Sequence, residues 1–148
     1  MTGSEMTRIA PALKAEFPAI LSLLEESDLP TAGVSRHVGT FFVARRGDRL
    51  LGCIGLEVYG EVGLLRSLAV RAEARGNGLG RVLVERLLTS ARKQELETIY
   101  LLTTTADRYF PRFGFEPADR EEADERLRSS EEFRGACPDT AVCMRLKM

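Results

Sequence analysis

The sequence has no tryptophan, a single histidine and only three cysteines in 148 residues. Cys53, Cys137 and Cys143 are odd in number and lack metal-ligand spacing, so neither a disulfide framework nor a metal site is expected. The chain also lacks an N-terminal signal peptide and an apolar run long enough to span a membrane. These absences predict a reduced, cytoplasmic protein with no metal and no membrane partner.

The chain has little excess charge of either sign. Its 21 basic and 22 acidic residues give a net charge of −1, and no basic run is longer than two residues. This argues against nucleic acid as a partner. A chain of 148 residues with 44% hydrophobic content is long enough for one sizeable core, so we expect a single domain over residues 1–148.

Glycine, by contrast, is concentrated in one informative segment, Arg75–Gly76–Asn77–Gly78–Leu79–Gly80, between a strand-like run and an amphipathic helix. Small residues let the backbone approach a ligand, and the unpaired N–H groups and dipole of the helix favour an anion. The segment therefore predicts a phosphorylated cofactor. It is not a dinucleotide fingerprint, which needs glycine where Arg81 stands, and it is not a P-loop, which needs Gly-Lys-Ser/Thr.

Hydrophobic periodicity separates the other elements. It predicts strands over 6–10, 40–46, 49–59, 64–70, 98–104, 115–117 and 141–146, and helices over 15–26, 79–93, 106–113 and 119–133. The polar segment 27–39 is expected to be a loop that shapes a site, with room for a short helix. The strand over 98–104 is expected beside the strand over 64–70, in the buried middle of an α/β sheet.

Two motifs carry a family resemblance. The Arg75-x-x-Gly78-x-Gly80 pattern after a strand resembles the acetyl-CoA motif of the GNAT acyltransferase superfamily, and residues 106–115 resemble its Ala-x-x-x-Tyr-x-x-x-Gly-Phe block, with Phe110 at the tyrosine position. The resemblance implies a mixed, mostly antiparallel sheet of six to seven strands, splayed at the cofactor site and flanked by helices. It also implies that acetyl-CoA is held by Leu68, Ala69, Val70, Arg75, Gly76, Asn77, Gly78, Leu79, Gly80, Arg81 and Thr105.

A narrower resemblance points to the acceptor. Residues 65–70, 100–106 and 137–144 are similar to the arsenic-resistance-associated N-acetyltransferase branch. The run 101–105, with Phe110 and Gly114–Phe115, is similar to the acetyltransferase domain of N-acetylglutamate synthase. Both resemblances imply an amino acid or a small amine as acceptor.

Glu57 and Arg66 are the polar residues that we single out in the predicted sheet. If residues 60–63 form the turn, Glu57 on one strand lies directly opposite Arg66 on the next strand. One interpretation is a cross-strand ion pair worth about 0.2–1 kcal/mol. The other makes Glu57 a catalytic base that acts through water and Arg66 a clamp for an acceptor carboxylate. His37, in the loop that lines the acceptor site in this family, is either a surface histidine or a second base.

The sequence thus predicts an acetyl-CoA-dependent N-acetyltransferase that acts on a small, amino-acid-like amine by direct attack in a ternary complex. A protein or peptide N-acetyltransferase and a non-catalytic acyl-CoA sensor stay open as alternatives. Because Phe110 cannot donate a proton, we expect the thiolate to leave without a protein acid and to take its proton from solvent or from the ammonium of the product. The alternative acid is Tyr109, which reaches the sulfur only if its short helix is rotated or irregular. Sheets of this kind often pair through their last strands, which allows a homodimer.

Overall fold

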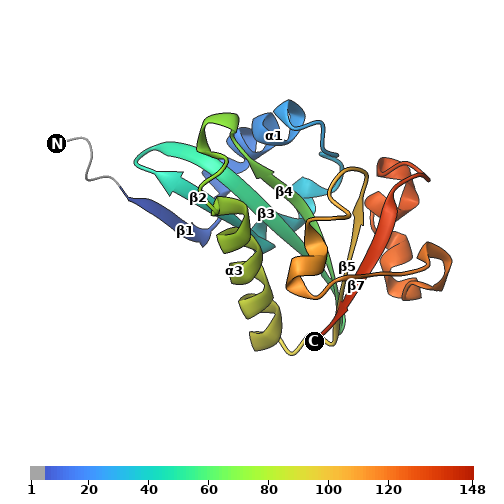
Figure 1. The fold of residues 1–148 in the computed structure, drawn as a ribbon. Helices are drawn as coiled ribbons and strands as arrows, with labels where there is room; N and C mark the ends of the chain where they lie inside the picture. Colours follow the sequence, from blue (N-terminus) through green and yellow to red (C-terminus); the bar gives the residue numbers. More distant parts are fainter. Residues whose placement is uncertain (1–5) are drawn as a thin grey trace.

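The computed structural model describes residues 6–148, in which seven strands form one sheet in the order β1-β2-β3-β4-β5-β7-β6 (Figure 1). Only β4 and β5 run parallel to each other. The mixed, mostly antiparallel sheet expected from the sequence is confirmed. The strands are β1 (Thr7–Pro11), β2 (Phe41–Arg46), β3 (Arg49–Tyr59), β4 (Val62–Val70), β5 (Thr98–Thr103), β6 (Glu116–Pro117) and β7 (Val142–Lys147).

The two longest helices cover opposite faces of the sheet. The α1 helix (Phe17–Glu26) packs with side chains such as Val43 and Cys53, whereas α3 (Leu79–Lys93) packs with Ile54, the next residue of the same strand. Successive strand residues point to opposite faces, so one strand serves both cores. Before residue 119, the other helices are α2 (Val34–His37) and short 3₁₀ segments at Lys14–Glu16, Val38–Thr40, Ala72–Ala74 and Phe110–Phe113. No helix within residues 6–148 is long and apolar enough to cross a membrane.

The sheet divides between β4 and β5, which lie together at one end and diverge at the other (Figure 1). Their pairing covers only Val62–Leu64 opposite Thr98–Tyr100. Beyond this point, β4 carries a β-bulge in which Ser67 and Leu68 oppose a single residue of β3. Ser67 has a φ of +61°, a left-handed conformation that is uncommon for a residue with a side chain. A bulge bends its strand, and the edge of β4 facing β5 is left without a partner strand.

The β3–β4 turn is tighter than the sequence suggested. Only Gly60 and Glu61 connect the strands, so Tyr59 pairs with Val62 and Glu57 with Leu64. The predicted pairing of Glu57 with Arg66 was therefore wrong by two residues. A shift of two keeps every side chain on its original face, and the two side chains still meet diagonally.

Two predicted helices differ in the structure. Residues 119–133 do not form one charged helix but two 3₁₀ turns, Arg120–Glu122 and Glu125–Ser129. They are followed by a kinked turn at Glu132–Ala136, which is broken at Gly135, where φ is +127°. The side chains of Asp119 and Asp124 each accept a hydrogen bond from a backbone N–H two residues later. These local hydrogen bonds begin a new turn at each aspartate and compete with a continuous helix. Residues 106–113 are helical only from Phe110 onward.

Candidate functional site

Two connected hollows follow the divergence of β4 and β5. We call the first, of about 580 Å³, the loop groove; it is lined by Ser27, Leu29, Leu68, Ala69, Val70, Ala74, Arg75, Gly76, Gly78, Leu79, Gly80, Arg81, Thr105, Tyr109 and Arg112. The second, of about 490 Å³, is the inner cavity, lined by Asp28, Leu29, Pro30, residues 65–68, residues 101–106, Phe110, Glu132, Cys137 and Pro138. The two hollows share Leu29, Leu68 and Thr105, so a single elongated ligand can occupy both.

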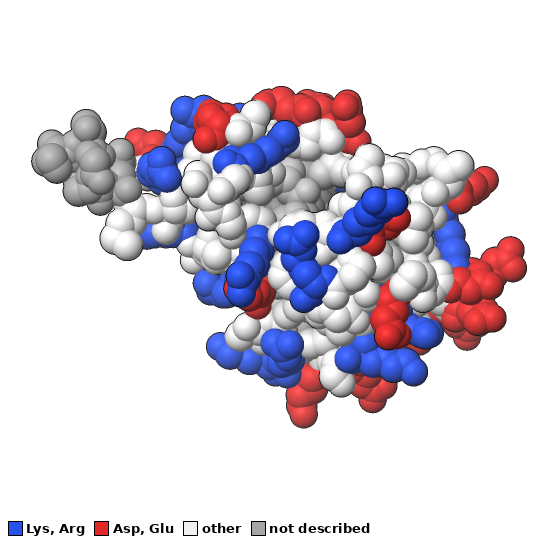
Figure 2. Space-filling model, in the orientation of Figure 1, with Lys and Arg blue, Asp and Glu red and all other residues white. Residues whose placement is uncertain are grey.

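The loop groove is suited to an anion. Gly76 and Gly78 have φ angles of +86° and +78°, and Gly78 is the N-cap of the 15-residue helix α3. Unpaired N–H groups of the first turn therefore face the groove at the positive end of the helix dipole. Three arginines and no acidic side chain are among the described residues that line it. Figure 2 shows Lys and Arg side chains gathered around a hollow on this face.

The groove gathers nearly all of the predicted cofactor-binding residues. Leu68, Ala69, Val70, Arg75, Gly76, Gly78, Leu79, Gly80, Arg81 and Thr105 all line it. Asn77 does not, because its side chain belongs to a separate hollow shared with Arg46 and Glu73. The Arg75 Nε donates to the Val70 carbonyl at 2.9 Å, which closes the turn and leaves the rest of this exposed guanidinium free for an anion. This geometry lets Arg75 both close the turn and contact a phosphate.

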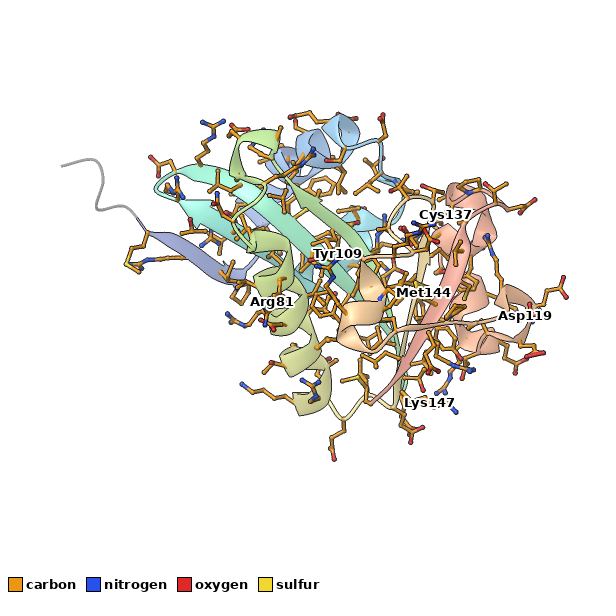
Figure 3. The ribbon with its side chains drawn as sticks, in the orientation of Figure 1. Arg81, Tyr109, Asp119, Cys137, Met144 and Lys147 are labelled. Atoms are coloured by element: carbon orange, nitrogen blue, oxygen red, sulfur yellow. The ribbon has the colours of Figure 1, made fainter. Side chains whose placement is uncertain are left out.

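Tyr109 and Phe110 point into different hollows. Tyr109 lines the loop groove, where its hydroxyl lies 3.2 Å from the point at which a Cβ on Gly80 would stand. Phe110 is buried and lines the inner cavity. Figure 3 labels Tyr109 and Arg81 on the α3 side of the molecule. Tyr109, the N-cap of the 3₁₀ helix Phe110–Phe113, thus lies at the loop groove, while burial raises the pKa of its phenol.

The Glu57 and Arg66 side chains form a fully buried ion pair, with the Arg66 Nη1 2.7 Å from the Glu57 Oε2. Arg66 also donates to the Ser67 hydroxyl at 3.0 Å and to the carbonyls of Ala32 and Pro30 at 2.7 and 3.0 Å. Because a guanidinium has five N–H groups, only one stays uncommitted. Arg66 lines the inner cavity, but it is already held by the protein and anchors the loop at residues 30–32.

Two further groups surround Glu57. The Tyr59 hydroxyl donates to the Glu57 Oε1, and the His37 Nε2 lies 3.5 Å from the same oxygen. Burial lowers the pKa of His37 more than Glu57 raises it, so the imidazole is neutral near pH 7. None of these three side chains lines the inner cavity. Tyr59 was missed by sequence reasoning, although its position two residues after Glu57 placed it on the same face.

Glu132 is a functional candidate that the sequence did not reveal, and it lies in the same cavity wall as Cys137. Both are buried and line the inner cavity. Burial raises the pKa of the Cys137 thiol to about 12, which keeps it protonated and argues against a thiolate nucleophile. Glu132 fell inside the segment that we predicted to be a surface helix, and its charge gave no sign that it would be buried.

Comparison with known proteins agrees with this geometry. The model of the acetyltransferase (GNAT) family matches residues 7–115. The amino-acid acetyltransferase of Mycobacterium tuberculosis is 32% identical over 135 residues, which cover 80% of this chain and 76% of that protein. The amino-acid acetyltransferase of Pseudomonas fluorescens is 37% identical over 90 residues, or 60% of this chain, but the chain spans only about a fifth of it (21%).

Solved structures share the fold. N-acetylglutamate synthase from Neisseria gonorrhoeae, complexed with coenzyme A and N-acetyl-glutamate, superposes with a TM-score of 0.82 at 22% identity, over 96% of this chain and 35% of that one. A Mycobacterium tuberculosis protein in complex with CoA gives a TM-score of 0.75 at 24% identity, over 95% of this chain and 99% of that one. The divided sheet, the glycine loop and the family match lead to one conclusion: the chain belongs to the GNAT family of acetyltransferases.

Proposed function

We propose that the chain is an acetyl-CoA-dependent N-acetyltransferase for a small, amino-acid-like amine. The observation that carries this proposal is the separation of charge along one continuous site. The loop groove presents Arg75, Arg81 and Arg112 to a pyrophosphate, whereas the inner cavity presents the carboxylates of Asp28 and Glu132 beside Arg66. A cofactor with its phosphates in the groove would place its thioester in the cavity, where an ammonium group is favoured.

The chain can promote this reaction without a covalent intermediate. The inner cavity would hold the acceptor amine beside the acetyl carbonyl, and such positioning supplies up to about 7–11 kcal/mol. The edge of β4 beyond Leu64 has no β5 partner, so a backbone N–H there can donate to the thioester oxygen. One oxyanion donor contributes about 3–4 kcal/mol.

The walls of the inner cavity favour a small acceptor over a protein or peptide. Residues 28–30 form one wall, and Glu132, Cys137 and Pro138 form another. The named relatives also point this way, since the Mycobacterium tuberculosis protein is called an amino-acid acetyltransferase. Arsenic-containing amino acids belong among the candidate acceptors on the narrower sequence resemblance alone.

The acceptor class is tested by incubating the protein and acetyl-CoA with amino acids, the amines that lack their carboxylates, polyamines, arsenic-containing amino acids and short peptides. We expect free thiol release with small amines and little with peptides. Because Arg66 has a single uncommitted N–H, pairs of acceptors with and without a carboxylate show whether it recognises that group. Binding of acetyl-CoA without turnover of any amine would instead favour the acyl-CoA sensor.

Tyr109→Phe is expected to keep kcat within a few-fold of the unmodified protein. The Tyr109 hydroxyl lies beside Gly80, in the loop groove where we propose that the phosphates bind. A thiolate whose parent thiol has a pKa of about 8.5 can also leave without a protein acid. Steady-state kinetics at saturating acetyl-CoA measures the effect. A loss of about 10²-fold or more, the scale of a general acid, would identify Tyr109 as the acid.

A further inference from the structure

Glu132 is a buried carboxylate that the protein satisfies only in part. Its side chain lines the inner cavity, and the residue is 3% exposed. One oxygen, Oε2, lies 3.6 Å from the Arg66 Nε, but Oε1 is buried and has no hydrogen-bond partner among residues 6–148. Buried polar atoms are nearly always paired in native structures. An orphan acceptor in the wall of a ligand cavity therefore marks a place for a donor on the ligand.

The charged groups around Glu132 leave it free to meet a cation. Arg66, from β4, is neutralised by Glu57 behind it and bonded to the loop carbonyls. Arg120 lies near the backbone side of Glu132 and donates to its carbonyl oxygen at 3.4 Å. The Cys137 thiol makes a hydrogen bond to the Glu132 carboxylate that slightly lowers the pKa of Glu132, but a thiol is only a weak donor. Asp28 adds a second negative charge to the cavity. The cavity therefore holds more negative than positive charge.

We propose that Glu132 binds the ammonium group of the acceptor through Oε1 and acts as the catalytic base. This proposal rests on the proposed function above. One ammonium proton moves to Oε1, and the neutral amine then attacks the thioester carbonyl. The C–N bond forms, the C–S bond breaks, and the departing sulfur takes a second proton from the nitrogen. Glu132 then returns its proton to solvent, which balances the reaction.

Geometry favours Glu132 over Glu57, the base that the sequence suggested. Both Glu57 oxygens already accept hydrogen bonds, one from Arg66 and one from Tyr59, and Glu57 does not line the inner cavity. Burial, only partly offset by Arg66, raises the pKa of Glu132 to about 7. A base works best when its pKa lies near the operating pH, and Glu132 has that property.

The first test is Glu132→Gln, which keeps the shape of the side chain and removes the base. We expect kcat/KM for the acceptor to fall by about 10²-fold or more at pH 7, with unchanged acetyl-CoA affinity by calorimetry. Glu131→Gln is the matched control, because the adjacent Glu131 pairs with Arg36 at the surface and lines neither hollow. An amine that is already neutral at pH 7, such as hydroxylamine, should lose much less activity in Glu132→Gln.

The pH profile separates catalysis from a structural role. In the unmodified protein, kcat/KM should rise with pH as Glu132 loses its proton, with a midpoint near 7 that is the same for acceptors of different amine pKa. In Glu132→Gln the midpoint should move up to the pKa of the acceptor's own amine.

Turnover by a folded Glu132→Gln protein with the original midpoint would overturn this proposal alone. So would a midpoint in the unmodified protein that follows the acceptor, a result that needs no variant. Failure of the unmodified protein to acetylate any amine would overturn the proposed function, and this proposal with it.

Discussion

Gly78→Val is expected to weaken acetyl-CoA binding by at least about 100-fold in a protein that stays folded. Gly78 precedes helix α3 in the loop groove, and no atom lies within 4 Å of the position that a Cβ would take. The valine side chain therefore occupies open space that the pyrophosphate needs. Loss of two charge-assisted hydrogen bonds, at about 1.5–3 kcal/mol each, accounts for an effect of this size.

The control for Gly78→Val must separate lost binding from backbone strain. The φ of +78° at Gly78 costs a residue with a side chain about 1–2 kcal/mol, which a typical domain stability of about 5–15 kcal/mol tolerates. Gly47→Val introduces similar strain, at a φ of +60°, in a turn that lines neither hollow. Calorimetry should show normal acetyl-CoA affinity in Gly47→Val. Normal affinity in a folded Gly78→Val protein would remove the loop groove as the cofactor site.

Local sequence signals were sufficient to predict the loop groove. The glycines that start α3 adopt left-handed φ angles, and the apolar stripe of the helix repeats at helical spacing, so nearby residues determine both features. The bulge at Ser67 could not be predicted in this way. Serine has no preference for its φ of +61°, and the bulge is a feature of how β3 and β4 pair, which the local sequence does not specify. The division of the sheet was therefore accessible only through the family resemblance.

The inner cavity depends on contacts between distant residues, which explains what the sequence missed. Glu132 is brought to Arg66 by the irregular segment 119–137, whose path is determined by aspartate side chains that bond to the backbone. Glu57 and Arg66 were identified in spite of a wrong turn, because a shift of two residues preserves faces. Their burial, and hence the size of their energetic effect, could not be read from strand alternation.

Arg66→Met is expected to destabilise the protein by about 3–5 kcal/mol, because it leaves the Glu57 carboxylate buried without its partner. The estimate of about 0.2–1 kcal/mol for an ordinary cross-strand pair does not apply, since both side chains are at most 1% exposed. Urea denaturation measures the change. Arg36→Met is the matched control, because Arg36 pairs with Glu131 but its side chain is 64% exposed; it should cost no more than about 1 kcal/mol.

The double variant Arg66→Met/Glu57→Gln identifies the source of the loss. If an unpaired buried charge dominates, neutralising Glu57 should recover part of the stability, with a coupling of about 0.5–3 kcal/mol between the two positions. The carbonyls of Pro30 and Ala32 lose a donor in both variants, so recovery should be incomplete. If Arg66→Met instead costs no more than Arg36→Met, the arginine is not needed for folding. Recognition of an acceptor carboxylate would then be the better reason for a guanidinium in the wall of the inner cavity.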